Sequence, residues 1–148
     1  MSSVVDTIAG GARSESEVWA AALRGTPEWE PVFSALAPDE LALGLETVYE
    51  AYLVHYGRPR LFDPPDADEA VLLGDYLYAH GLVRIAEAGG VAAVRVLAGL
   101  ISRCAALRAD GLDGDGDAWV DAARALGGVP DEDAVALALA LHSARVAS

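Results

Sequence analysis

Lysine is absent from this 148-residue chain, in which all ten basic residues are arginine. With 23 acidic residues, the formal net charge at pH 7 is -13. A surface of this sign repels the phosphate backbone of nucleic acids and the anionic headgroups of a membrane. The charge therefore argues against nucleic acid and anionic membranes as partners.

Cysteine is nearly absent as well, because Cys104 is the only one. A single cysteine excludes an internal disulfide, and inside an apolar stretch it is expected to be a small buried residue. The histidines His55, His80 and His142 lack the spacing of zinc ligands, so each is interpreted as an ordinary helix-face residue.

Targeting and membrane signals are also lacking. The N-terminus has no basic start followed by a sustained apolar run, which excludes a secretory signal. No stretch approaches the roughly 18 uncharged apolar residues that a membrane span needs. These absences predict a cytoplasmic protein without a transmembrane segment.

Apolar residues are abundant, at 53% of the chain, and they are densest in residues 69–110. Leucine, valine, isoleucine or tyrosine occurs there at almost every helical turn, which predicts two long helices buried on most sides. Gly89 and Gly90 interrupt the pattern, and so short a connection predicts an antiparallel return with the helices packed side by side. Gly74 and Gly81, seven residues apart, predict a close helix crossing.

Helix start and stop signals predict the remaining elements. A capping box at Ser14 begins a short helix, and Pro38 with its following acidic residues begins a longer one that runs to about Tyr56. Residues 57–68 contain three prolines and form a loop. Two further helices are expected, at residues 118–126 and from residue 130 onward.

Together these elements predict an all-α, single-domain fold, a helical bundle of about five to six helices over residues 14–148. A chain of this length has room for one domain with a real core. Residues 1–13 contain two adjacent glycines and few apolar anchors, so they are expected to be flexible or to dock on a partner.

Glu46 and Glu50 are the first candidates for a site, because they lie one helical turn apart on the same side of a predicted helix. Two such carboxylates can share a hard divalent ion such as Mg²⁺. Arg58 and Arg60 in the following loop could bind a diphosphate. The alternative, which spacing alone favours, is a solvated helix face followed by a basic loop.

Asp113, Asp115 and Asp117 are spaced like the start of a calcium-binding loop. Such a loop needs glycine and glutamate at positions that are occupied here by Ala118 and Arg124. The segment is therefore interpreted as a solvated acidic turn.

Residues 70–78 read AVLLGDYLY and are followed by His80-Gly81-Leu82. This segment resembles the central helix of trans-polyprenyl diphosphate synthases, which typically carries an AVLxGDxLxxxA-like pattern. The resemblance covers about residues 41–111. It implies part of the isoprenoid synthase fold.

Upstream motifs of that family are present in eroded form. Gly57-Arg58-Pro59 is similar to the end of the family's RRGxP motif, with His55 and Tyr56 in place of the two arginines. The family's DDxxD motif falls on Glu46 and Glu50. Its second Asp-rich motif and its GKR diphosphate-binding motif have no counterpart in this sequence.

The family reaction ionises an allylic diphosphate between two carboxylate clusters that hold magnesium ions. One reduced cluster without an opposing one cannot clamp a diphosphate from both sides. The resemblance therefore implies a truncated, non-catalytic relative that acts through association, as a homo-oligomer or as an accessory subunit of an active prenyl synthase.

Two alternative functions remain open. An isoprenoid or other apolar small-molecule binding protein would keep a tunnel between its helices, lined by Leu73, Leu77 and Tyr78, with Arg58 at the polar head. A residual Mg-dependent diphosphate enzyme would use the two glutamates of the eroded motif.

Asp75 separates these functions in part. It lies in the middle of the same apolar helix, where an unpaired buried carboxylate is costly. It is expected to pair with Arg95 or Arg103, or to face a polar cavity. A cavity beside Asp75 favours ligand binding, whereas a closed ion pair favours a structural module.

Overall fold

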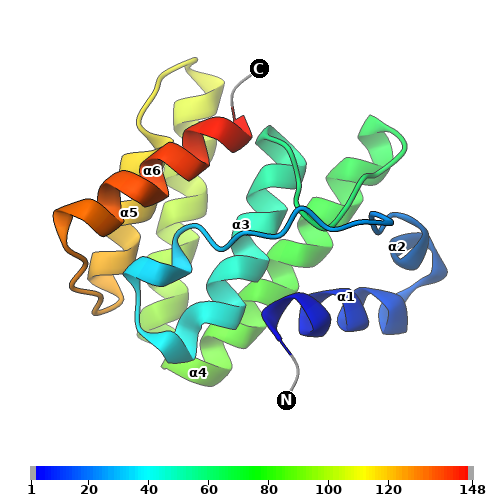
Figure 1. The fold of residues 1–148 in the computed structure, drawn as a ribbon, viewed down its shortest axis with the longest axis horizontal. Coiled ribbons are helices and arrows are strands. Elements are labelled where there is room, and N and C mark those ends of the chain that lie inside the picture. Colours follow the sequence, from blue (N-terminus) through cyan, green and yellow to red (C-terminus); the bar gives the residue numbers. More distant parts are fainter. Residues whose placement is uncertain (1–2, 147–148) are drawn as a thin grey trace.

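The computed structural model describes residues 3–146, and within them the chain forms six α-helices and no β-strand (Figure 1). The α-helices are α1 (Val4–Glu15), α2 (Glu17–Ala21), α3 (Ala42–Tyr56), α4 (Ala67–Ala109), α5 (Asp115–Ala125) and α6 (Glu132–Val146). Two short 3-10 turns, η1 (Ser34–Leu36) and η2 (Asp39–Leu41), precede α3. The expectation of an all-α protein with five to six helices is confirmed.

Helix α3 is the centre of the fold. All eleven residues from Gly44 to Val54 are buried. A helix that is enclosed on every side needs neighbours all round it, and α3 contacts α1, α4 and α6 as well as both 3-10 turns. It ends at Tyr56, as predicted, where Gly57 follows in an extended conformation.

Helix α4 changes direction at Gly90, whose φ of 72° and ψ of -168° are not helical. Glycine alone adopts such a positive φ without strain. Figure 1 shows α3 in the angle between the two halves of α4. The prediction that the halves return side by side is wrong, because each half instead packs against α3, the more completely buried helix.

The first half of α4 crosses α3 closely, as its glycines predicted. A Cβ atom placed on Gly81 would lie 2.5 Å from Cγ2 of Val48, and one on Gly74 would overlap the imidazole of His55. Both glycines are buried in α4. The absence of a side chain at these two positions lets the two backbones approach.

The N-terminal residues are ordered into α1, which corrects the expectation of flexibility for residues 4–13. Ile8 and Ala12 are buried in a core cluster with the first half of α4. Ser3 caps α1 and Ser16 caps α2, so the capping box predicted at Ser14 does not form. The apolar spacing in residues 4–12 is sufficient to anchor this helix.

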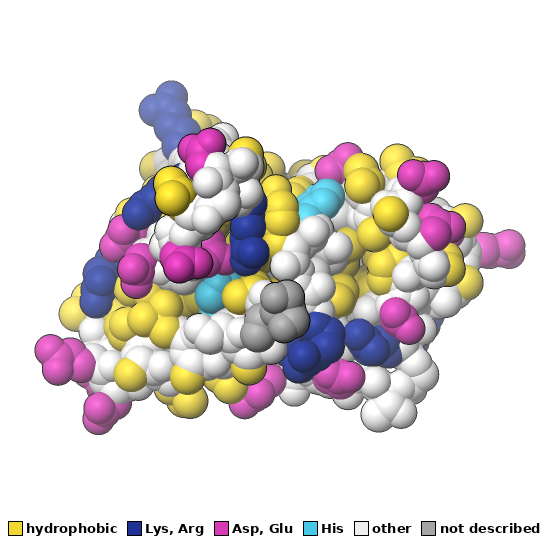
Figure 2. All heavy atoms as spheres, turned by 90° about the horizontal axis from the view of Figure 1, so that it is seen from above, with side chains coloured by type: hydrophobic (Ala, Val, Ile, Leu, Met, Phe, Trp, Pro, Cys, Tyr) yellow, Lys and Arg dark blue, Asp and Glu magenta, His cyan; other side chains and the backbone are white. Residues whose placement is uncertain are grey.

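Helices α5 and α6 belong to the core cluster that also joins α3 and the second half of α4, on the side of α3 away from α1 (Figure 1). Trp119 of α5 stacks on Phe33 beside η1, with the ring centroids 5.4 Å apart. Helix α5 begins at Asp115, three residues before the predicted start, because Gly114 reverses the chain with a φ of 118°. Figure 2 shows acidic side chains spread around one face of the molecule, with hydrophobic side chains exposed between them.

Candidate functional site

Glu46 and Glu50 lie on the buried side of α3, where both carboxylates bind Arg60 from the loop before α4. Arg60 donates from Nη1 to Glu46 at 2.5 Å and from Nε to Glu50 at 3.0 Å. None of the three side chains is more than 1% exposed. The Trp29 ring centroid lies 4.1 Å from the guanidinium carbon. One cation and two anions thus form a closed ion cluster.

Backbone groups complete this ion cluster. Burial alone would lower the pKa of Arg60, but Glu46 and Glu50 outweigh it and raise that pKa above its usual value. Four backbone N–H groups donate to the two carboxylates, those of Val32, Ser34, Arg60 and Leu61. The ion cluster therefore connects residues 32–34, which precede α3, and residues 60–61, which follow it, to the middle of α3.

The lone pairs that a magnesium ion would need are already engaged. A metal at Glu46 and Glu50 would have to displace the Arg60 guanidinium and the four backbone N–H groups that donate to these carboxylates. The geometry therefore does not support the predicted site. Within residues 3–146 no group of three or more His, Cys, Asp or Glu is arranged to hold a metal. Arg58 is 54% exposed and its Nε lies 3.6 Å from Glu28. Because Arg60 is enclosed while Arg58 is at the surface, their placement gives a joint diphosphate site no support.

The predicted tunnel residues lie in the core. Leu73 and Leu77 are at most 1% exposed and pack against α1. Tyr78 is half-buried, and its ring stacks on His55 with the centroids 5.2 Å apart. Because these side chains fill space between helices, their placement gives the tunnel no support.

Asp75 lies on the surface, with its side chain 69% exposed. Its carboxylate is 3.5 Å from Nε2 of His55. The expectation that it is buried and pairs with Arg95 or Arg103 is wrong. Asp75 lies at the edge of the face of α4 that packs on α3, where its carboxylate reaches His55 and stays open to solvent.

A second polar cluster joins α3, α4, α5 and α6. His142 has Nδ1 2.7 Å from the Tyr49 hydroxyl and Nε2 3.0 Å from the Asp115 carboxylate. Asp115 also accepts hydrogen bonds from Tyr52 and, at 2.8 Å, from Arg108. Tyr49 and His142 are buried. This polar cluster ties the last helix to the centre of the fold.

The electrostatics of this cluster favour a fixed anion. Burial raises the pKa of Asp115, but hydrogen bonds from His142 and Tyr52 and the charge of Arg108 outweigh it and hold that pKa well below its usual range. Burial raises the pKa of Tyr49, which stays neutral. Both imidazole nitrogens already have partners, so the arrangement fastens helices and leaves no nitrogen free to serve a bound molecule.

Sequence reasoning missed this cluster. The sequence pattern indicates a solvated turn at Asp115 and an ordinary helix-face residue at His142. They are 27 residues apart, on helices that only the fold brings together. The available signal was weak: a histidine on an apolar helix, and an aspartate at the start of another.

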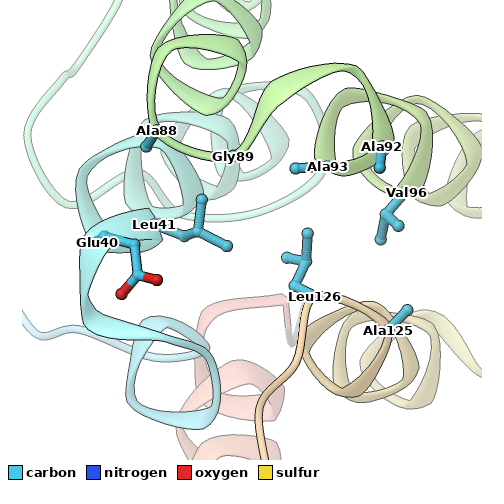
Figure 3. A pocket seen from close by; sticks show the side chains of 9 residues that line it. All are labelled: Glu40, Leu41, Ala88, Gly89, Ala92, Ala93, Val96, Ala125 and Leu126. Atoms are coloured by element: carbon cyan, nitrogen blue, oxygen red, sulfur yellow. The ribbon is translucent and has the colours of Figure 1, made fainter.

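A groove with both apolar and polar walls runs between the second half of α4 and α5. It consists of two adjoining pockets of about 240 and 300 Å³. Both are lined by Val96 and Ala125, so they are continuous. Figure 3 shows the first pocket, where Leu41 and Leu126 point into the space beside α4. We call this feature the α4–α5 groove.

Charged side chains border the α4–α5 groove. Arg95 and Arg103 of α4 and Asp121 of α5 line its second pocket, and Glu40 lies at the far end of the first. Arg103 donates to Asp121 at 3.1 Å, while Arg95 forms no ion pair with any other residue between 3 and 146. Gly99 lies between the two arginines, and a Cβ there would meet no atom within 4 Å.

Helix α4, which forms one wall of this groove, leaves much of its most apolar stretch exposed. By length and composition, α4 is the one helix in the described residues that could cross a membrane, yet only 22% of its most apolar 18-residue stretch is buried. A core helix of a soluble protein passes the same test, but it is mostly buried. Cytoplasmic location without a membrane span therefore stays a prediction.

Comparison of the chain with protein-family models, with curated proteins and with solved structures found no match.

Proposed function

We propose that this protein acts by associating with another helical chain through the α4–α5 groove, and not as a catalyst. The observation that carries the proposal is the exposed apolar surface of α4. Only 22% of the most apolar 18-residue stretch of α4 is buried, and soluble monomers rarely leave a large apolar surface uncovered. A helix-in-groove contact would cover it, with small side chains such as Ala92 and Ala125 allowing a close approach.

The two polar clusters support a non-catalytic role. In each cluster the charged groups are paired with one another, and they connect segments that are distant in the sequence. Catalytic carboxylates and histidines need a free side that faces substrate. In the cluster around Arg60 every charged side chain is enclosed, and in the cluster around Asp115 the histidine is enclosed.

The relation to trans-polyprenyl diphosphate synthases is part of this proposal. The AVLLGDYLY segment lies on α4, where Leu73 and Leu77 pack in the core. In such a relative, Arg60 would take the place of the metal between Glu46 and Glu50. A homo-oligomer or an accessory subunit of an active synthase is the form of association that this ancestry would favour.

Native mass spectrometry of untagged protein purified from its source tests the proposal. We expect a complex heavier than the 15.3 kDa chain. Replacing Gly99 with glutamate should abolish the complex, because the variant places a bulky charged side chain in the groove at a position where the added Cβ meets no atom within 4 Å. The matched control is Gly10→Glu on α1, another helical glycine with open space around it. A lone 15.3 kDa species at micromolar concentration would refute association.

An apolar small-molecule carrier is the second candidate, favoured by the pocket in Figure 3. Leu41, Ala93, Val96 and Leu126 give it apolar walls. Its volume of about 240 Å³ falls below the roughly 300 Å³ at which ligand pockets begin. The same mass spectra distinguish the two functions, because a carrier would retain a lipid of a few hundred daltons on a single chain.

A further inference from the structure

The charged residues that border the α4–α5 groove are arranged so that a second copy of the same chain could pair with them. We infer that its occupant is a second copy of this protein, packed antiparallel about a two-fold axis at Gly99, with Arg95 of each copy pairing with Asp121 of the other. This inference rests on the proposed function, because it names the partner in the same groove.

The spacing on α4 gives the first step. Arg95 and Arg103 lie four residues on either side of Gly99. If two copies of α4 cross antiparallel at Gly99, residue 95 of one copy lies opposite residue 103 of the other. A two-fold contact is self-complementary in this way, so one pairing is formed twice.

The position of Asp121 gives the second step. Its Oδ2 accepts from Arg103 at 3.1 Å, which places it level with Arg103 on the facing wall of the groove. Within residues 3–146, Oδ1 of Asp121 has no hydrogen-bond donor, and Arg95 has no ion-pair partner. The uncompensated cation of one copy therefore meets the open carboxylate oxygen of the other.

The shape of the groove gives the third step. Gly99 leaves open space where the helices would cross, and glycine costs a helix interior about 1 kcal/mol relative to alanine. Nothing in the single chain uses that space. A crossing helix would use it, because two helix backbones approach closely where side chains are small.

Overall charge decides the conditions of the test. Two copies of net charge -13 repel one another at low ionic strength. At about 0.15 M salt the screening length is roughly 8 Å, so this long-range repulsion is largely removed while contact pairs persist. Sedimentation equilibrium of the purified chain at 0.15 M salt should therefore give twice the 15.3 kDa monomer mass at micromolar concentration.

A charge exchange tests the pairing. Asp121→Arg should weaken the dimer by about tenfold, since Arg95 of one copy would then face two cations of the other, Arg103 and the new arginine. The double variant carries Arg95→Glu as well. The double variant should recover most of the lost affinity. Arg124→Glu is the matched control, because this exposed arginine of α5 does not line the groove. Failure of the double variant to recover would overturn the antiparallel arrangement.

A crosslink tests the axis. Gly99→Cys should form a disulfide between copies on mild oxidation, whereas Gly10→Cys should not. The native Cys104 does not compete, because it is 1% exposed and burial raises its thiol pKa to about 11. A wild-type chain that remains monomeric at 0.1 mM, a concentration chosen as roughly a hundredfold above micromolar affinities, overturns the inference. If native mass spectra then still show a heavier complex with a different protein, the proposed association through the groove stands and only the inference of a second copy fails.

Discussion

Replacing Arg60 with methionine should lower the free energy of unfolding much more than the same replacement at Arg58, the other arginine of the 57–68 loop. The guanidinium is fully buried between Glu46 and Glu50, which are at most 1% exposed. Removing it leaves two buried carboxylates that face one another without a cation. Breaking a buried pair in this way costs about 3–5 kcal/mol, a large share of the 5–15 kcal/mol that typically holds a domain together.

The matched control is Arg58→Met, two residues earlier in the same loop. Arg58 is 54% exposed, and its partner Glu28 is 46% exposed, so their pairing contributes at most about 1 kcal/mol. Urea unfolding followed by far-ultraviolet circular dichroism measures both variants. With a slope of about 2 kcal/mol per molar urea, Arg60→Met should lower the midpoint by about 2 M and Arg58→Met by less than about 0.5 M.

Equal urea-unfolding midpoints for the two variants would show that the ion cluster contributes no more to stability than the exposed pair of Arg58 and Glu28. If Arg60→Met does not fold at all, Arg60→Lys supplies the intermediate test. Arg60 also donates to the backbone carbonyls of Glu30 and Glu46. Lysine keeps the positive charge but cannot donate to two carboxylates and two carbonyls in a planar fork. Its midpoint should therefore fall between those of wild type and Arg60→Met.

Two further predictions concern packing and pH. Gly81→Ala should destabilise the protein by about 1–3 kcal/mol, because the added methyl group meets Val48 at 2.5 Å, whereas Gly10→Ala on open α1 should raise the melting temperature slightly. Asp115→Asn should cost about 2–3 kcal/mol at pH 7. Because folding lowers the pKa of Asp115, its contribution is fully present above the unfolded value of about 4 and is lost as pH falls below it. The difference between wild type and Asp115→Asn should therefore shrink in acid; a difference that is constant from pH 7 to pH 2 would contradict this role.

The sequence predicts only part of the arrangement of the four candidate residues near Tyr56, which are Glu46, Glu50, Arg58 and Arg60. The spacing of Glu46 and Glu50 correctly places them on one side of a helix. It cannot tell whether that side faces water, a metal or a buried arginine, because the answer depends on how the later loop folds back. Arg58 and Arg60 look equivalent in sequence, yet one is exposed and the other is enclosed.

At Gly90 the sequence predicts that the chain changes direction, but it does not predict which helix the two halves of α4 pack against. Two adjacent glycines after a long apolar run correctly predict a change of direction in the chain. The pattern favours a hairpin because it contains no information about a third helix. In the structure, α3 occupies the angle between the two halves, so each half buries its apolar stripe against α3.

Local chemistry by itself determined that this chain is helical, that α3 ends at Tyr56, and that Gly74 and Gly81 mark a close crossing, because caps, periodicity and side-chain volume act over a few residues. Only the tertiary structure decided which polar groups meet: Arg60 pairs with two glutamates, His142 pairs with Asp115, and Arg95 has no ion-pair partner among residues 3–146. Electrostatic and packing partners are set by distance in space, and a sequence pattern records only distance along the chain.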